Sequence, residues 1–140
     1  MSIYRRNISS NKINKVVAVL LFVSFCQAAS SKEADYQKEY ESCIAKHSEL
    51  NNMVIHWCVD GILSVLNNEI NSKFKSLREM YSKDAPQDVE KLEKAQESWA
   101  SYRDAQCELA GTHIGSPMFS ICPMKGSIQR LKEINDLLQQ

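Results

Sequence analysis

The chain has 140 residues, which is the size of a single domain. Seventeen basic and seventeen acidic residues balance, so the composition gives no sign of a nucleic-acid-binding protein. Only four Gly and three Pro are available for the tight turns of a β-sandwich, and we therefore expect an all-α fold.

The first 32 residues contain no acidic residue and have the pattern of a secretory signal peptide. Four basic residues precede the apolar run at 16–25, and Ala28 and Ala29 offer a small-residue cleavage site. As a helix this run reaches only about 15 Å, half of the hydrocarbon core, so we expect no permanent membrane span. The sequence predicts a signal peptide at 1–29 and a periplasmic or secreted domain at 30–140.

Alternatives for this segment are an uncleaved anchor, a lipid-modified Cys26 and an organelle transit peptide. Lipidation conflicts with Phe25, which stands where a small residue is normally required. A transit peptide would be amphipathic and Arg-rich, not built around one apolar block. After cleavage, thirteen basic residues face seventeen acidic ones, a net charge of −4 that favours cationic partners but also serves solubility.

Apolar residues spaced by three and four predict helices along the rest of the chain. The first covers 33–48, with Tyr36 and Tyr40 on its apolar face, and 49–52 forms a turn. The second is the longest, and Gly61 weakens it by about 1 kcal/mol without breaking it. Its predicted apolar face consists of Ile55, Cys58, Ile62, Leu66, Ile70, Phe74, Leu77 and Tyr81.

A third helix is predicted after the break at 82–87, with Asp84 as its N-cap and Pro86 in its first turn. Its apolar face is predicted to contain Val89, Leu92, Ala95, Trp99, Tyr102 and Leu109. The Gly- and Pro-containing segment 111–123 is predicted to be a structured loop, and a last helix carries Ile128, Leu131, Ile134 and Leu138. The expected architecture is an antiparallel bundle of about four helices.

Four cysteines remain after removal of the leader, an even number in an oxidising compartment. Three pairings are possible, and the spacing favours Cys43 with Cys58 and Cys107 with Cys122. Both pairs are 15 residues apart and lie on either side of a polar or Gly-containing segment, so a helical hairpin would bring each pair together. Two disulfides would then brace the bundle.

A metal site is the alternative interpretation of these cysteines. Cys43, His47, His56 and Cys58 supply four side chains of the types that bind zinc. The His-x-Cys spacing is unusual for zinc, however, and cysteines of exported proteins normally oxidise. We expect no metal and no other cofactor.

The sequence carries no recognisable active site. The sequence contains neither a Gly-x-Ser-x-Gly motif nor a phosphate-binding glycine loop. Glu90, Glu93 and Glu97 alternate with Lys91 and Lys94 at the spacing of a solvated helix face. We therefore expect a protein that is not an enzyme.

The densest group of aromatic and charged residues lies between 96 and 107. Trp99 and Arg103 are four residues apart, so the guanidinium can lie against the indole. Tyr102 is expected to enter the core with Trp99, whereas Arg103 and Asp104 are expected to point apart and to need other partners. This segment is interpreted first as the packing spine of the bundle.

The same residues resemble the LprI-like lysozyme inhibitor family of bacterial exported proteins. The resemblance covers about residues 40–132 and rests on Cys43, Cys58, Ile70, Asn71, Phe74, Leu77, Gln96, Trp99, Tyr102, Arg103, Asp104, Cys107, Gly115, Ser116, Cys122, Arg130 and Leu131. Three positions depart from the family pattern: Asn68 in place of an acid, Ile70 in place of Leu, and Phe74 in place of Tyr.

The resemblance implies inhibition of a lysozyme by non-covalent binding. We expect a cationic lysozyme as the protein partner and place the candidate inhibitory loop at 111–119, with His113, Ser116, Met118 and Phe119 as its contact residues. In the alternative interpretation of these residues, Met118, Phe119 and Ile121 only cap the bundle. The alternative function is a non-catalytic envelope protein that binds a different protein.

Overall fold

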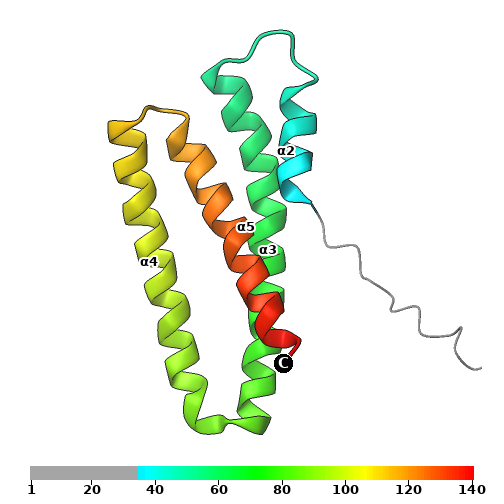
Figure 1. Cartoon of the computed structure of the whole chain (residues 1–140), viewed down its shortest axis with the longest axis vertical. Helices are drawn as coiled ribbons and strands as arrows, with labels where there is room; N and C mark the ends of the chain where they lie inside the picture. The colour runs from blue at the N-terminus through cyan, green and yellow to red at the C-terminus, as the bar shows by residue number, and fades with distance from the viewer. Residues whose placement is uncertain (1–34) are drawn as a thin grey trace, which may run out of the picture. The chain divides into compact units, whose positions relative to one another are not determined.

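The computed structural model describes residues 35–140, so the predicted leader and Cys26 lie outside the described residues. Within 35–140 the chain forms four α-helices and one short 3-10 helix, with no β-strand. They are α2 (Tyr36–Ile44), α3 (Asn52–Asp84), η1 (Pro86–Asp88), α4 (Val89–His113) and α5 (Met118–Leu138). The three long helices run antiparallel in succession, and α2 lies beside the first half of α3 (Figure 1). The predicted all-α bundle of four helices is confirmed.

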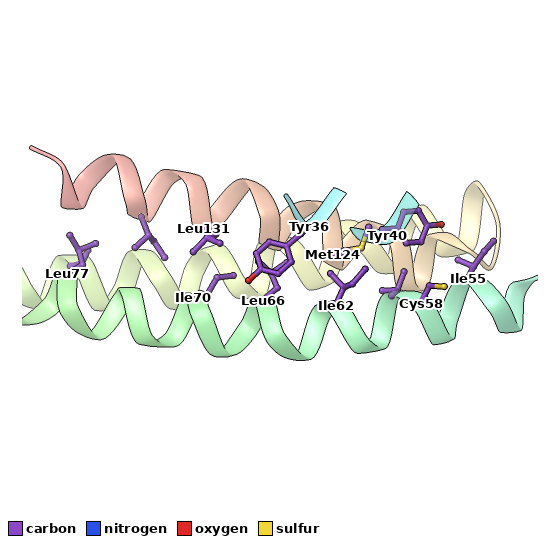
Figure 2. Close-up of a cluster of buried hydrophobic side chains, with 13 residues drawn as sticks. Tyr36, Tyr40, Ile55, Cys58, Ile62, Leu66, Ile70, Leu77, Met124 and Leu131 are labelled. Atoms are coloured by element: carbon purple, nitrogen blue, oxygen red, sulfur yellow. The ribbon is translucent and has the colours of Figure 1, made fainter. Parts of the chain in front are cut away.

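The central element is α3, whose apolar stripe faces α5 and α2. Figure 2 shows Ile55, Cys58, Ile62, Leu66, Ile70 and Leu77 in one row along this helix. Met124, Leu131 and Ile134 of α5 complete the buried cluster. The row has the predicted spacing of three and four residues, and Phe74 and Tyr81 are partly buried at its edge. The predicted core face of this helix is therefore confirmed.

A short helix, α2, covers the first half of this stripe. The Asp35 side chain accepts a hydrogen bond from the backbone N–H of Lys38 and caps the helix. Tyr36 and Tyr40, one turn apart, are buried against α3. The helix ends at Ile44, earlier than the predicted residue 48, so His47 is exposed and lies outside it.

At the α3–α4 corner, the predicted N-cap is wrong. Asp84 is the last residue of α3, and the chain turns at Ala85 before the 3-10 helix that begins with Pro86. A residue that precedes proline is disfavoured in the helical conformation, and Ala85 adopts φ −148° and ψ 61°. The proline restricts Ala85, so α3 ends at Asp84, two residues before Pro86.

The prediction of a long structured loop at 111–123 is also wrong. Helix α4 continues through Gly111 to His113, and α5 already begins at Met118, so only four residues connect them. Pro117 stands directly before α5, where its missing N–H costs nothing. Pro123 lies inside α5 and removes one helical hydrogen bond, but the helix continues past it. Among the described helices, none is long and apolar enough to cross a membrane.

The contact between α2 and α3 predicts how stability depends on pH. The Tyr36 hydroxyl donates a hydrogen bond to the Glu69 carboxylate, and burial together with this carboxylate raises the pKa of Tyr36 above its usual value. Above about pH 10 the unfolded chain releases the tyrosine proton while the folded chain retains it, so the unfolding free energy falls as pH rises. Tyr36→Phe should flatten this decline in denaturant melts between about pH 8 and pH 11.

The matched control for this experiment is Tyr102→Phe, a change at an exposed tyrosine of α4. It should leave the pH dependence as it is in the unaltered protein. An alkaline decline that is equally steep in the Tyr36→Phe protein would contradict the assignment.

Candidate protein-binding site

One end of the bundle brings together two segments that are far apart in the sequence. The turn between α4 and α5 lies against the start of α3, where Asn52 Nδ2 donates a hydrogen bond of 2.7 Å to Ser116 Oγ. One turn further along α3, His56 Nδ1 and Ser120 Oγ are 2.8 Å apart. Both contacts join residues separated by 64 positions, so the start of α3 and the turn form one surface.

The turn itself depends on two glycines. Gly115 has φ +143°, a value that L-residues with side chains rarely adopt. Gly111 is buried under Phe119, since a Cβ built at this position would lie only 2.3 Å from the phenyl ring. The missing side chain of Gly111 thus lets the first turn of α5 fold back onto the last turns of α4.

Both predicted disulfides are confirmed, and both lie near this end of the bundle. Cys43–Cys58 joins the end of α2 to α3, with 5.8 Å between the Cα atoms. Cys107–Cys122 joins the last part of α4 to the first part of α5, with 5.4 Å between the Cα atoms. Each bridge closes a loop of about 15 residues, which stabilises the fold by about 3 kcal/mol in the chain-entropy description.

The first disulfide also decides the question of a metal site. The side chains of Cys43, His47 and Cys58 do converge, with potential ligand atoms within 4.8 Å of one another. The two sulfur atoms are bonded to each other, however, and thiolates are the form that binds zinc. His56 is turned toward Ser120 and Asp60. The four side chains are therefore not arranged as a zinc site.

Four large apolar side chains are exposed around the joined segments. Leu50 just before α3 and Met53 in its first turn are 61% and 77% exposed, and Ile114 and Phe119 at the α4–α5 turn are 75% and 52% exposed. We call these four residues, together with His113 and Ser116 between them, the apical surface. Exposed apolar side chains that gather at one place mark interaction sites more often than scattered ones do.

The charge around the apical surface is negative. The two segments that build it, 47–72 and 104–124, contain no Lys or Arg. The acidic residues of these segments nearest to the turn and to the start of α3 are Glu49, Asp60 and Glu108, while Glu69 accepts from Tyr36 and Asp104 pairs with Arg103. At the opposite end of the bundle, acids and bases pair with one another, as in Arg78–Glu93 and Lys91–Asp88. A partner that approaches the apical surface therefore meets these carboxylates, and the base nearest to Leu50 in the sequence is the exposed Lys46 of the α2–α3 loop.

The four predicted contact residues lie in different environments. His113 is the exposed last residue of α4, and Ser116 is exposed but already bonded to Asn52. Phe119 shows half of its ring to solvent and packs the other half on Gly111. Met118 is partly buried in the groove between α4 and α5, away from the other three. The structure thus gathers His113, Ser116 and Phe119 and leaves Met118 apart.

Three exposed residues of the apical surface were missed by the sequence analysis. Ile114 lies within the predicted loop, but its exposure follows from the tight four-residue turn. Leu50 and Met53 belong to the surface because Asn52 bonds to Ser116, a contact 64 residues apart in sequence. No local pattern signals that contact, and only the arrangement of the helices reveals it.

A second group of residues, the aromatic and charged motif, lies where α4 faces α5. The Trp99 ring has the Arg103 guanidinium 4.8 Å from its centroid and the Arg130 guanidinium 5.6 Å from it. Arg130 also donates to Gln96 Oε1 at 2.9 Å and to Glu133 at 3.0 Å, and Arg103 reaches Ser127 at 3.3 Å. The motif therefore packs one helix on another, as its interpretation as a packing spine predicts.

Two details of that interpretation are wrong. Tyr102 is exposed and not in the core, because the side of α4 that faces α5 carries Gln96, Trp99 and Arg103. Arg103 and Asp104 do not point apart: Nε and Nη2 of Arg103 donate to one Asp104 oxygen at 2.9 and 2.8 Å. The long arginine side chain bends back along the helix surface to its neighbour.

The comparison with known families agrees with the residues of this motif. The family described as lysozyme inhibitor LprI matches the chain over residues 26–135. The chain belongs to the LprI family. The resemblance expected over 40–132 is thus confirmed over a longer range. No curated protein and no solved structure gives a significant match.

Membership in LprI relates the described residues to a family of inhibitors and not to a family of enzymes. The match includes all six motif positions from Gln96 to Cys107 and the whole apical surface. Since the motif residues hold α4 against α5, they position the turn that α4 and α5 carry.

The close contact in this turn generates a prediction. In Gly111→Ala the new Cβ would collide with the Phe119 ring, which must swing into solvent or push the helices apart. We expect a loss of about 1–3 kcal/mol of unfolding free energy, measured by chemical denaturation. Combining Gly111→Ala with Phe119→Ala should cost less than the sum of the two single changes.

The matched control is Gly61→Ala on α3, where no atom lies within 4 Å of the new Cβ. This change should stabilise the protein by up to about 1 kcal/mol through helix propensity. Equal destabilisation by both alanine substitutions would contradict the role given to Gly111.

Proposed function

We propose that this LprI protein is an exported inhibitor of lysozyme that binds the enzyme non-covalently through the apical surface. The observation that carries the proposal is the exposed apolar turn at 114–119, fixed by a disulfide, in a member of this inhibitor family. A turn that is already ordered can enter an enzyme cleft at little further entropic cost.

Chemical complementarity supports lysozyme as the partner. Lysozymes are typically cationic enzymes, and the apical segments present carboxylates without a Lys or Arg. Ile114 and Phe119 supply apolar contact, and the His113 ring and Ser116 hydroxyl can form hydrogen bonds with catalytic carboxylates of the enzyme. These groups bind and obstruct, so the proposed protein performs no reaction and needs no cofactor.

Export by the predicted leader at 1–29 is part of the proposal, because inhibitor and lysozyme must meet outside the cytoplasm. An oxidising compartment is consistent with both disulfides of the described domain. Whether the protein stays in the periplasm or is released, the proposed inhibitory surface is the same.

The first experiment measures lysozyme-driven clearing of a cell-wall suspension with and without the purified, oxidised protein. Lysozymes of several structural types are compared, each at low and moderate salt. We expect dose-dependent protection that weakens as salt rises, because the net charge of the partner surfaces is opposite. A folded protein that protects against none of them would contradict inhibition and favour the alternative, an envelope protein with another partner.

A set of variants then tests the apical surface. Met53→Ser and Ile114→Ser alter exposed side chains of the apical surface, and each should weaken inhibition by about tenfold. The pair His113→Ala and Ser116→Ala should abolish measurable inhibition. Circular dichroism and thermal melts check that each variant keeps the fold.

Tyr102→Ser is the matched control for these variants, since it removes an exposed apolar side chain of α4 about 18 Å along the helix from the turn. Its inhibitory potency should equal that of the unaltered protein. If Tyr102→Ser abolishes inhibition while the apical variants retain it, the inhibitory site lies on the helix face instead.

A further inference from the structure

Gly61 is an unusual residue in the middle of the long helix α3. Glycine inside a helix costs about 1 kcal/mol relative to alanine. The buried Gly111 and the partly buried Gly126 have internal reasons, because a Cβ at these positions would approach Phe119 at 2.3 Å and Arg103 at 3.2 Å. A Cβ at Gly61 would meet nothing within 4 Å. Packing within the described domain therefore gives no reason for glycine here.

The space beside Gly61 belongs to a groove between α2 and α3 with a volume of about 480 Å³. The buried residues Cys58 and Ile62 form its base, together with the disulfide to Cys43. Trp57 and Val65 line it from positions that are 65% and 56% exposed. A disulfide and a packed helix pair thus support the groove from below.

The glycine forms a notch in this groove. Trp57, Gly61 and Val65 are four residues apart, so they follow one another along the same face of α3. With no side chain at Gly61, the indole and the valine stand on either side of bare helix backbone. His47 packs edge-on against the indole with 5.6 Å between the ring centroids, which supports the Trp57 ring from the side of the loop.

Two carboxylates line the same groove, Glu39 from α2 and Asp60 from α3. Asp60 lies 3.3 Å from the His56 ring, and Glu39 makes no ion pair with any residue in 35–140. Of the two lysines nearest to Glu39 within 35–140, Lys38 pairs with Asp35, and Lys46 lies in the loop beyond α2. The groove therefore has an electron-rich ring and two acidic groups, and no Lys or Arg lines it.

We propose that this groove binds the side chain of an arginine or lysine on a protein partner. The cationic head lies between Glu39 and Asp60, and the aliphatic stem lies in the notch of Gly61 against the Trp57 ring. An exposed aromatic ring attracts a cation at its face, and the carboxylates add charge complementarity. The proposal does not require that the partner is a lysozyme, so it stands or falls separately from the proposed function.

The test uses N-acetyl-arginine amide and N-acetyl-lysine amide as probes, and N-acetyl-citrulline amide as the neutral match of the arginine probe. The protein has only two tryptophans, so the indole N–H signals of Trp57 and Trp99 report separately in an NMR titration. We expect a saturable shift of the Trp57 signal with both cations, little shift with citrulline, and an unmoved Trp99 signal. An equal response to citrulline, or no response to either cation, would overturn the proposal.

Variants identify the groups involved. Glu39→Gln combined with Asp60→Asn should weaken binding of the arginine probe by about tenfold, since both acidic partners are removed. Gly61→Leu should abolish the Trp57 response by filling the notch, and it should raise or keep the thermal midpoint because leucine favours helix. Asn68→Leu, at an exposed position of α3 outside the groove, is the matched control and should bind normally.

Sedimentation of the unaltered protein distinguishes a cationic side chain from a second copy of the chain as the occupant. We expect the unaltered protein and Gly61→Leu to sediment alike, without a dimer that depends on the groove. A concentration-dependent dimer that disappears in Gly61→Leu, together with no Trp57 shift from the cationic probes, would overturn the proposal in favour of self-association. Retention of arginine binding by a folded Gly61→Leu protein would overturn it as well.

Discussion

The position of α4 depends on one tryptophan held between two arginines and on one disulfide. Of its 25 residues, only Leu92, Cys107 and Gly111 are buried, far fewer than in α3. Contacts of Trp99 hold α4 on α5 where a row of buried apolar residues would otherwise do so. The ring contacts the guanidinium groups of Arg103 from α4 and Arg130 from α5. These arginines also donate hydrogen bonds, Arg130 to Gln96 and Arg103 to Ser127. A half-buried polar contact of this kind fixes orientation more narrowly than apolar packing, since each donor requires its own acceptor.

The fixed orientation of α4 on α5 also fixes the position of the turn between them. Three contacts follow one another along α4 toward the turn. The Trp99 contacts orient α4 on α5, and the Cys107–Cys122 disulfide then links the two helices. Next to the turn, the Phe119 ring packs on Gly111. Asn52 and His56 then attach the turn to α3. The apical surface is therefore supported by three helices, although its own residues are mostly exposed. That division lets exposed residues serve binding while others maintain their geometry.

The predictability of each helix followed the chemistry of its buried face. In α3 the buried residues are Cys58 and aliphatic residues, and their spacing in the sequence located all of them except Val59. In α4 the face toward α5 is polar, and a search for apolar residues chose Ala95, Tyr102 and Leu109, which are all exposed. The glycines and prolines of 111–123 predicted a loop. In the structure Gly111 lies within α4 and leaves room for the Phe119 ring, and Pro117 directly precedes α5. Long-range contacts such as Asn52 to Ser116 have no local signature at all.

The two disulfides stabilise one end of the bundle more than the other. Both disulfides lie toward the end where α3 begins and α4 meets α5, whereas the reversal from α3 through η1 to α4 is held by noncovalent contacts, among them the exposed pairs of Arg78 with Glu93 and of Lys91 with Asp88. Exposed ion pairs contribute little to stability, so we expect backbone amides near residues 82–90 to exchange with solvent before those beside the disulfides. The α3–α4 reversal is accordingly the place to insert a reporter or an affinity tag. If the helices separate locally there, the two disulfides still hold them together at the opposite end of the bundle.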